Sequence, residues 1–397
     1  MTAYDVIVCG GGSAGLAAAL SASRESARTL LVERHAALGG AGSNALVHTF
    51  CGLFHPDVSQ GPQWLNPGIP TEIGQRLMAL SHQQAPDLMG RVYVLRHEPT
   101  ALARLALELC QQEPRLTVQT NATLTDVAHE AGQWLLTINA VQIAAKAIVD
   151  TTGDAAVARC LGKDDLWQTA PGDRLYRPAY VFSLQGVADP LDDATRLQVA
   201  ALLVRAVKAG TLSKAALGAT LRPSPQPGEV FISMDLEAGG ADWDPLDTAK
   251  VSALERNGKT AALAIANYLR EHHPAFALSP SPTLPVHVGI RESARWQGDY
   301  VLTAADLLSS RRFEDEIALA GWPLEMRESA KGPKFHYFDQ PQPAGIPARC
   351  LRKASVPGLF FAGRCLSADH DALASVRVMG TCLATGQAAG RMAAHAV

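Results

Sequence analysis

The first 35 residues alternate between apolar runs, a glycine-rich turn and an Ala- and Leu-rich stretch. Apolar runs at residues 4–9 and 29–33 predict strands, and the stretch from the turn to about residue 26 predicts a helix. A strand, a helix and a second strand within about thirty residues form one βαβ unit. The pattern therefore predicts that the chain begins with two strands of a parallel sheet.

The segment from residue 36 to residue 90 differs, because it is rich in Gly, Pro, His and Asn. Its spacing predicts a single helix, at residues 71–84. So long an irregular segment is unusual inside a compact domain, and it favours a stretch that faces a cofactor or a substrate. The later pattern predicts a helix at 99–112 and strands at 116–118, 134–139 and 147–150.

Between residues 165 and 340 the pattern changes again, and Pro-rich joints interrupt it. Strands and helices are expected in turn at 179–187, 191–217, 229–235 and 244–273. An apolar strand at 359–363 and an Ala-rich helix at 377–396 then return to the first pattern.

Together these elements predict an α/β protein with a Rossmann-like, dinucleotide-binding domain built on a parallel sheet. That domain would be discontinuous, with residues 1–164 as its first part and residues 341–397 as its second. Residues 165–340 would form an inserted α+β domain, with the substrate held between the two domains.

The glycine-rich turn has the chemistry of a dinucleotide site. Gly10, Gly12 and Gly15 fit the pattern GxGxxG, directly after a strand and at the start of a helix, with Ser13 and Ala14 between them. Glu33 follows at the end of the second strand, where a carboxylate accepts hydrogen bonds from a ribose. The helix N-terminus would hold the pyrophosphate. The alternative is a glycine turn that binds no ligand.

Further segments carry a resemblance to a known family. They are LGGAG at 38–42, IVDTTGD at 148–154, VGIRESAR at 288–295, GLFFAGRC at 358–365 and SADHDALASVRVM at 367–379. The set resembles the FAD-binding signature of the glutathione-reductase-type flavoproteins. It is most similar to the FAD-dependent oxidoreductases, which are related to fumarate-reductase-type flavoproteins. The resemblance covers nearly the whole chain and is weak between about residues 160 and 285.

The resemblance implies that the dinucleotide is FAD and that the predicted Rossmann-like domain binds it. The residues that it assigns to the cofactor are Gly10, Gly12, Ser13, Ala14, Gly15, Glu33, Arg34, Gly39, Gly40, Thr152, Gly153, Asp154, Gly363, Arg364, Ser375 and Met379. Many members of the broader superfamily have Asp where this chain has Arg364. That arginine would balance the pyrophosphate charge or, alternatively, pair with a structural carboxylate.

The implied function is an FAD-dependent dehydrogenase or oxidase that moves a hydride between a small organic substrate and noncovalent FAD. The alternatives are a flavin monooxygenase and a non-catalytic FAD-binding protein. No second GxGxxG and no CxxC pair follows, so NAD(P)H is not indicated as the partner. The electron acceptor stays open between oxygen, a quinone and a protein carrier, and the oligomeric state stays open as well.

Three side chains are candidates for catalysis: His370, His48 and Arg291. His370 falls in the expected turn before the last helix, where a neutral imidazole could accept the substrate proton or, alternatively, organise the loop. His48 lies with Cys51 and His55 in the irregular segment, which in the family runs under the flavin. Covalent attachment of FAD through His or Cys in this segment is a further alternative.

Arg291 and Arg295 would share one face if their segment were helical. With them, a locally basic stretch is formed by His287, Lys331, Lys334, His336 and Arg349. This stretch would hold an anionic substrate against the flavin. The alternative is that these basic residues form ion pairs between the domains, notably with Glu292, Asp299 and Asp306.

The composition bears on the partners and the location of the protein. Hydrophobic residues make up 47% of the chain and charged residues 18%, with a net charge of −3. Nothing in this balance indicates a nucleic-acid partner, and no apolar run is long enough for a membrane span. The seven cysteines lack the spacing of a disulfide framework or a zinc site, and no metal site is predicted. We therefore expect a reducing, cytoplasmic location.

Overall fold

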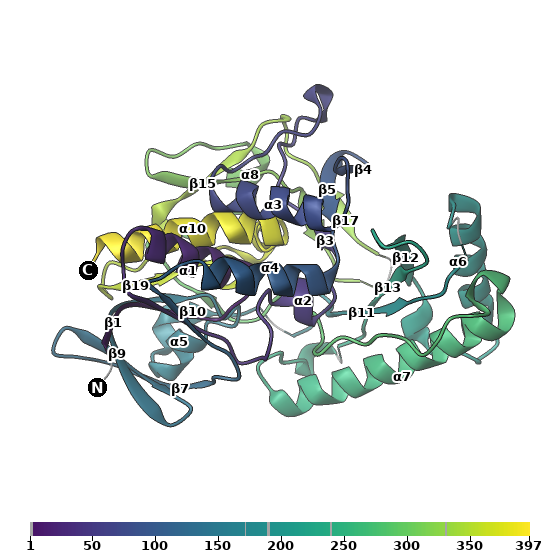
Figure 1. The fold of residues 1–397 in the computed structure, drawn as a ribbon, viewed down its shortest axis with the longest axis horizontal. Coiled ribbons are helices and arrows are strands. Elements are labelled where there is room, and N and C mark those ends of the chain that lie inside the picture. Colours follow the sequence, from purple (N-terminus) through teal and green to yellow (C-terminus); the bar gives the residue numbers. More distant parts are fainter. Residues whose placement is uncertain (1–2, 171, 189–190, 239, 330–331) are drawn as a thin grey trace.

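A computed structural model describes residues 3–170, 172–188, 191–238, 240–329 and 332–397. Its largest sheet has seven strands (Figure 1). The parallel strands, in spatial order, are β6 (Leu116–Gln119), β2 (Thr29–Val32), β1 (Ala3–Cys9), β9 (Val141–Asp150) and β19 (Leu359–Phe361). The antiparallel strand β8 (Gln133–Ile138) pairs with β9, and β7 (Leu124–Glu130) pairs with β8. This mainly parallel sheet confirms the predicted α/β, Rossmann-like fold.

The central strands are apolar on both faces, as strands covered on both sides must be. Val6, Ile7 and Val8 of β1 are fully buried, and so are Ile148 and Val149 of β9. Strand β19 comes from the far end of the sequence and pairs with residues 148–150 of β9. The C-terminal part of the chain therefore completes the sheet that the N-terminal part begins.

One face of the sheet carries a helical layer, visible in Figure 1. Its members are α1 (Ser13–Arg24), α3 (Ile69–Leu80), α4 (Pro99–Gln111) and α10 (Met379–His395). Helices α1 and α10 pack backbone to backbone. A Cβ added at Gly386 would lie 2.1 Å from the Ala14 carbonyl oxygen, and one at Gly390 would lie 2.2 Å from that of Ala18. Only glycine at these two positions permits so close an approach.

The irregular segment 36–90 contains more structure than the single expected helix. The additional elements are α2 (Ala41–Asn44), β3 (Thr49–Phe50) and β4 (Asp87–Met89). Both strands pair with β5 (Val92–Arg96). The sequence expectation misses them because they are only two to four residues long, too short for a periodic pattern to appear.

The second unit extends to the right in Figure 1. Its sheet is antiparallel, with β11 (Ala179–Leu184) and β12 (Thr220–Pro223) on either side of β13 (Val230–Asp235). Helices α6 (Asp193–Lys208) and α7 (Thr248–His272) belong to this unit, and each begins at an aspartate that caps it. A separate hydrophobic cluster, from Leu175 to Val288, forms its core.

Part of the segment expected in the inserted domain packs against the first unit. Leu302, Leu307, Ala318 and Leu324 pack into the same hydrophobic cluster as α1 and α10. Further short helices and strands lie in this part of the chain and in the segments that connect the two units. They are α5 (Ala156–Cys160), β10 (Trp167–Gln168), β14 (Arg295–Trp296), α8 (Ala304–Leu308), β15 (Glu316–Ala320), β16 (Leu324–Met326), β17 (Lys334–His336), β18 (Ala344–Pro347) and α9 (His370–Val376). The domain boundaries themselves stay a prediction.

Over the described residues, none of the helices combines the length and the apolar character that a membrane crossing requires.

Candidate functional site

Four parallel strands end at one edge of the large sheet, and the predicted cofactor residues follow them. Gly10 follows β1, Glu33 follows β2, Thr152 follows β9, and Gly363 follows β19. Ligands of open α/β sheets bind at this carboxyl edge. Segments that are distant in the sequence are therefore brought together where a dinucleotide would lie.

The turn after β1 has the shape that a pyrophosphate requires. Gly10 has a φ of +101°, which favours glycine. A Cβ at Gly15 would lie 1.6 Å from the Gly10 carbonyl oxygen, so only glycine lets α1 start this close to the strand. At Gly12, in contrast, the nearest atom to an added Cβ is 3.8 Å away. The space at Gly12 borders Gly40, whose Cα an added Cβ would touch without a clash.

Helix α1 presents its N-terminus to this space. Gly12 is its N-cap, Ser13 and Ala14 are its first residues, and no side chain among the described residues caps it. Its first turn contains no acidic residue. The free N–H groups and the helix dipole therefore favour an anion at this point.

A second glycine pair closes over the first turn. The Gly39 N–H donates to the Gly11 carbonyl, at 2.8 Å. A Cβ on Gly40 would lie 2.7 Å from the Gly12 Cα, and Gly40 has a φ of +56°. The two loops thus approach each other through glycine on both sides, and the cradle that results fits a phosphate group.

Glu33 is buried and joins the two loops. Its Oε2 accepts a hydrogen bond from the Gly11 N–H at 2.6 Å, and its Oε1 accepts one from the His35 N–H at 2.8 Å. A carboxylate has about four acceptor positions, so lone pairs are left for a ribose diol.

A charged group lies at the ends of β9 and β19. Arg364 Nη2 lies 2.8 Å from Asp154 Oδ1, and Arg34 Nη2 lies 3.8 Å from the other oxygen of the same carboxylate. Ser293, which the sequence analysis did not single out, accepts a hydrogen bond from Arg364 at 2.6 Å. The alternative of a structural pair for Arg364 is therefore realised, and the guanidinium lies beside Gly153.

Asp150, the last residue of β9, holds the loop that carries Asp154. It is fully buried, and its two oxygens accept hydrogen bonds from the Thr152 hydroxyl at 2.7 Å and from the Trp296 indole N–H at 3.0 Å. Burial raises the pKa of Asp150, although these hydrogen bonds act in the opposite direction. The strand end and the Thr152–Asp154 loop are held in place by this carboxyl.

A family model described as "FAD dependent oxidoreductase" matches residues 5–397. The chain belongs to the FAD-dependent oxidoreductase family. A search of curated protein sequences finds no match. The family assignment confirms FAD as the cofactor, and the glycine cradle and the uncapped α1 fit its pyrophosphate.

Solved structures similar to this oxidoreductase are distant. A geranylgeranyl bacteriochlorophyll reductase-like protein from Thermoplasma acidophilum has 14% identity and a TM-score of 0.44, over 100% of this chain and 78% of that one. The p-nitrophenol 4-monooxygenase PnpA from Pseudomonas putida has 11% identity and a TM-score of 0.38, over 93% and 74%. The flavin-dependent monooxygenase PieE, solved with FAD and substrate, has 17% identity and a TM-score of 0.40, over 75% and 51%.

Replacing Glu33 with alanine is expected to weaken FAD binding by about 10- to 100-fold. The change would remove the hydrogen bonds that we expect Glu33 to accept from the ribose, and a bond to a charged group contributes roughly 1.5–3 kcal/mol. Calorimetric titration of the cofactor-free protein with FAD would measure the loss. Glu130→Ala, at an exposed site on β7, is the matched control. Equal affinity in Glu33→Ala and the control would refute the ribose role.

His370 does not lie in a plain turn, which corrects the expectation. It begins the short helix α9, which Asp369 caps through the Ala372 N–H at 2.6 Å. Its Nδ1 lies 3.0 Å from Glu292 Oε1 and its Nε2 lies 3.0 Å from Glu328 Oε1.

The two carboxylates affect the pKa of the His370 ring. Burial acts to lower the pKa of His370, but Glu292 and Glu328 raise it above its ordinary value. Each ring nitrogen faces a carboxylate, and this arrangement favours the protonated ring over the neutral imidazole that a proton acceptor needs. Its ring also stacks on Tyr176, with centroids 4.4 Å apart. This environment suits a residue that organises the loop, and a catalytic role for His370 stays a prediction.

His48 has the opposite environment. It is 5% exposed, and its ring stacks on Phe231 of β13, with centroids 4.3 Å apart. Its Nδ1 lies 3.3 Å from the Leu46 carbonyl, whereas its Nε2 is buried and has no partner among the described residues. Burial, reinforced by Arg222, lowers the pKa of His48 to about 3. The ring is therefore neutral, with one nitrogen free.

Arg291 and Arg295 do not share a helix face. Gly289 pairs with Ala179 as an edge of the second sheet, so this segment is extended instead. Arg291 Nη2 lies 2.8 Å from Asp235, and Arg295 pairs with the buried Glu292. Burial lowers the pKa of Arg291 to about 10, still far above neutrality.

The rest of the expected basic stretch is spread out. Arg349 pairs with Asp315, His287 stacks on His35, and Lys334 and His336 lie on the exposed strand β17. Lys331 lies outside the described residues. The named acidic partners pair elsewhere as well, Asp299 with Arg352 and Asp306 with Arg311.

The other candidates lie near the start of α10. Met379 is its first residue, and the Cys51 carbonyl accepts a hydrogen bond from the Gly380 N–H at 2.9 Å. Burial raises the pKa of the Cys51 thiol to about 12. The Ser375 hydroxyl donates to the Trp322 carbonyl, and His55 accepts from the Asp57 N–H at 3.1 Å. As cofactor or catalytic contacts these side chains remain predictions.

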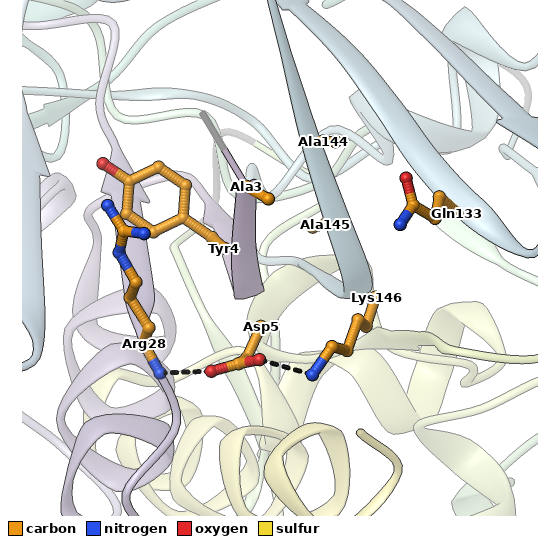
Figure 2. A pocket seen from close by; sticks show the side chains of 8 residues that line it. All are labelled: Ala3, Tyr4, Asp5, Arg28, Gln133, Ala144, Ala145 and Lys146. Atoms are coloured by element: carbon orange, nitrogen blue, oxygen red, sulfur yellow. Dashed lines mark hydrogen bonds and ion pairs between the residues drawn. The ribbon is translucent and has the colours of Figure 1, made fainter. Parts of the chain in front are cut away.

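A separate cavity of about 200 Å³ lies at the opposite edge of the sheet (Figure 2). It is lined by Ala3 and Tyr4 of β1 and by residues 144–146 of β9. Figure 2 shows Asp5 between the Arg28 N–H and the Lys146 ammonium, at 2.9 and 2.8 Å. These two hydrogen bonds connect β1 with β9 and with Arg28, which precedes β2. The cavity is therefore remote from the cofactor edge.

Acid is expected to destabilise the protein through its buried neutral histidines. Burial lowers the pKa of His97 to about 4, although a contact with the Gly42 carbonyl acts in the opposite direction. The unfolded chain binds this proton near pH 6.5, so stability is complete above that pH and is lost as the pH falls toward 4. At pH 5.5 the loss for His97 is about 1 kcal/mol.

Urea unfolding at pH 7.5 and pH 5.5 would measure this loss. His97→Phe should reduce the difference between the two pH values, because phenylalanine cannot take up a proton. His129→Phe makes the same change on an exposed strand position and should leave the difference unaltered. A His97→Phe variant as sensitive to acid as the control would argue against the prediction.

Proposed function

We propose that this oxidoreductase is a dehydrogenase or oxidase that transfers a hydride between a small organic substrate and noncovalently bound FAD. The observation that carries the proposal is His48, a buried and neutral imidazole whose Nε2 has no partner among the described residues. His48 lies between the glycine pair at 39–40 and Cys51, which contacts the start of α10. It is thus connected on both sides to elements expected to hold the cofactor.

The N-terminus of α10 supports the same reaction. Helix α10 has seventeen residues (Met379–His395), and no side chain among the described residues caps it. A Cβ on Gly380 would lie 2.5 Å from the Gly52 backbone, so the segment 51–53 approaches this helix end very closely. The positive end of a helix dipole favours negative charge on a reduced flavin held there.

The roles can be assigned to particular atoms. Bound FAD supplies the site that accepts the hydride from the substrate carbon. His48 Nε2 has a free lone pair and would take up the proton that the substrate loses, provided that the negative charge of a bound substrate raises the low pKa of the ring toward neutrality. The Leu46 carbonyl holds the proton on Nδ1 and thereby keeps Nε2 unprotonated. Stacking on Phe231 fixes the plane of the ring.

The state of Cys51 supports noncovalent FAD. Its buried thiol stays protonated because its pKa is about 12, and a protonated thiol is a poor nucleophile. A covalent link through this residue would need the thiolate.

An anaerobic substrate screen tests the function. Carboxylates, amines, alcohols and sugars would be mixed in turn with the yellow protein, and the flavin absorption would be followed. Bleaching by one class is the expected result. Oxygen uptake that depends on NADPH would instead indicate a monooxygenase. A protein that holds FAD but responds to no donor would support the non-catalytic alternative. After bleaching, oxygen, a quinone or a protein carrier would be added to identify the electron acceptor.

A further inference from the structure

Four arginines gather where the two units meet, next to His48 and the start of α10. We call them the arginine cluster: Arg222 of β12, Arg291, Arg327 and Arg377. They come from four different segments. Two carboxylates lie among them, Asp235 of β13 and Glu325 of β16.

Together, the two carboxylates form ion pairs with two of the arginines. Arg291 and Arg327 bind Asp235 at 2.8 and 2.9 Å, and Arg327 also binds Glu325. Burial acts to raise the pKa values of both carboxyls, but the arginines hold them below their ordinary values. Both carboxylates are therefore ionised, and each is paired with at least one of these two arginines.

The other two arginines have no carboxylate partner among the described residues. Arg222 Nη1 contacts only a weak acceptor, the Met89 sulfur, at 2.9 Å. Arg377 Nη2 donates to the Glu325 carbonyl at 3.3 Å, and its guanidinium lies over the Tyr176 ring. Its Nε is buried and has no partner among the described residues.

Asp235 and Glu325 are thus bound by Arg291 and Arg327, whereas Arg222 and Arg377 have no direct carboxylate partner within the cluster. Both of these arginines are only partly exposed, and a partly buried charge is more stable when an anion pairs with it. The cluster therefore has the composition of a site that is completed by an anion. Arginine offers the planar pair of N–H donors that matches a carboxylate.

Arg222 lies close to the proposed reaction site, because it pairs across the strands with Phe231, on which His48 stacks. The charges of both Arg222 and Arg377 also act on the Cys51 thiol. The free Nε2 of the nearly fully buried His48 is a second, independent sign of a missing partner. Apolar side chains of Trp322 and Val378 lie beside Cys51 and would contact the organic part of a ligand.

A cavity lies at the end of β12. This cavity of about 330 Å³ is lined by Arg96, Ser224, Pro225 and residues 81–85. Arg96 donates to the carbonyl of Pro223, the residue next to Arg222.

We infer that the substrate is a small organic carboxylate whose carboxylate group is bound by Arg222 and Arg377. Its reacting carbon then lies toward His48. This inference rests on the proposed function and makes it more specific, because it names the class of substrate. It assigns the binding of the anion to two arginines other than Arg291, which Asp235 already neutralises.

The test uses the FAD-loaded protein. Succinate, lactate and benzoate are titrated against it, each beside its neutral amide, with inorganic phosphate as a further probe. Binding is followed by the flavin spectrum and, independently, by calorimetry. We expect at least one carboxylate to bind saturably and its amide not to bind. Arg222→Gln and Arg377→Gln should each weaken that binding roughly ten- to hundred-fold.

Control variants separate binding from folding. Arg256→Gln removes an exposed arginine of α7 and should bind the carboxylate as the unmodified protein does. Arg222→Lys keeps the charge and should recover part of the affinity. The FAD content of every variant is measured, because a loss of FAD would mean that the arginine supports the fold or the cofactor.

Several outcomes would overturn the inference. They are no saturable binding of any carboxylate, equal binding of the amides, a clear preference for phosphate, or unchanged affinity in both glutamine variants. A protein without bound FAD, or one that binds a carboxylate without ever bleaching, would instead count against the proposed function. Calorimetry does not depend on the flavin and so distinguishes these two failures.

Discussion

His48→Gln is expected to slow the reduction of the flavin by substrate about 10²- to 10⁴-fold, while FAD content stays normal. Loss of a general base has an effect of this size, equivalent to roughly 3–5 kcal/mol in the barrier. Glutamine fills similar space but cannot take up a proton at neutral pH. Anaerobic stopped-flow absorption, with the substrate identified in the screen, would measure the rate.

His370→Gln is the informative comparison. His370 lies between Glu292 and Glu328, so its loss should destabilise α9 and change the reduction rate by less than tenfold. Urea unfolding in parallel would show the loss of stability. A large fall in rate in His370→Gln, together with a normal rate in His48→Gln, would move the proton acceptor to His370.

The double variant Gly386→Ala/Gly390→Ala is expected to lose about 2–6 kcal/mol of unfolding free energy. In an ordinary helix, alanine is more favourable than glycine by about 1 kcal/mol. Here each new methyl group would lie little more than 2 Å from a carbonyl oxygen of α1, so the helices must move apart. Overpacking of this kind costs typically 1–3 kcal/mol per site, or more.

Urea unfolding would measure the change, and FAD affinity should fall with it, because Ala14 belongs to the dinucleotide turn. Ala201→Leu adds a larger group to the exposed side of α6 and should change stability by less than about 0.5 kcal/mol. A double variant as stable as this control would show that α1 and α10 are not as closely packed as described.

Local patterns in the sequence were enough to predict the core of the fold. The strand, glycine turn and helix over residues 4–26 are neighbours in the chain, and their spacing reflects contacts between near residues. Glu33 could be placed for the same reason, because the second strand of a βαβ unit ends at a nearly constant distance from the turn.

The charge environment of the site could not be predicted in this way. The partners of His370 come from residues 292 and 328, and Arg222 and Arg377 both act on Cys51 only because the two units pack together. The conditional expectation, that Arg291 and Arg295 would share one face if their segment were helical, is not met for a related reason. Pairing between Gly289 and Ala179 is a long-range contact, and it outweighs the local helical spacing.

The pairing of α1 with α10 has a consequence for biosynthesis. The ribosome releases the glycine turn and α1 early, yet the strand and the helix that cover them are made long afterwards. Until then the nascent chain exposes an apolar helix face and an unpaired strand edge, which are the features that favour aggregation. Such high contact order also slows folding. We therefore expect the recovery of active protein to depend on chaperones and on available FAD, which would bind only after the last helix has docked.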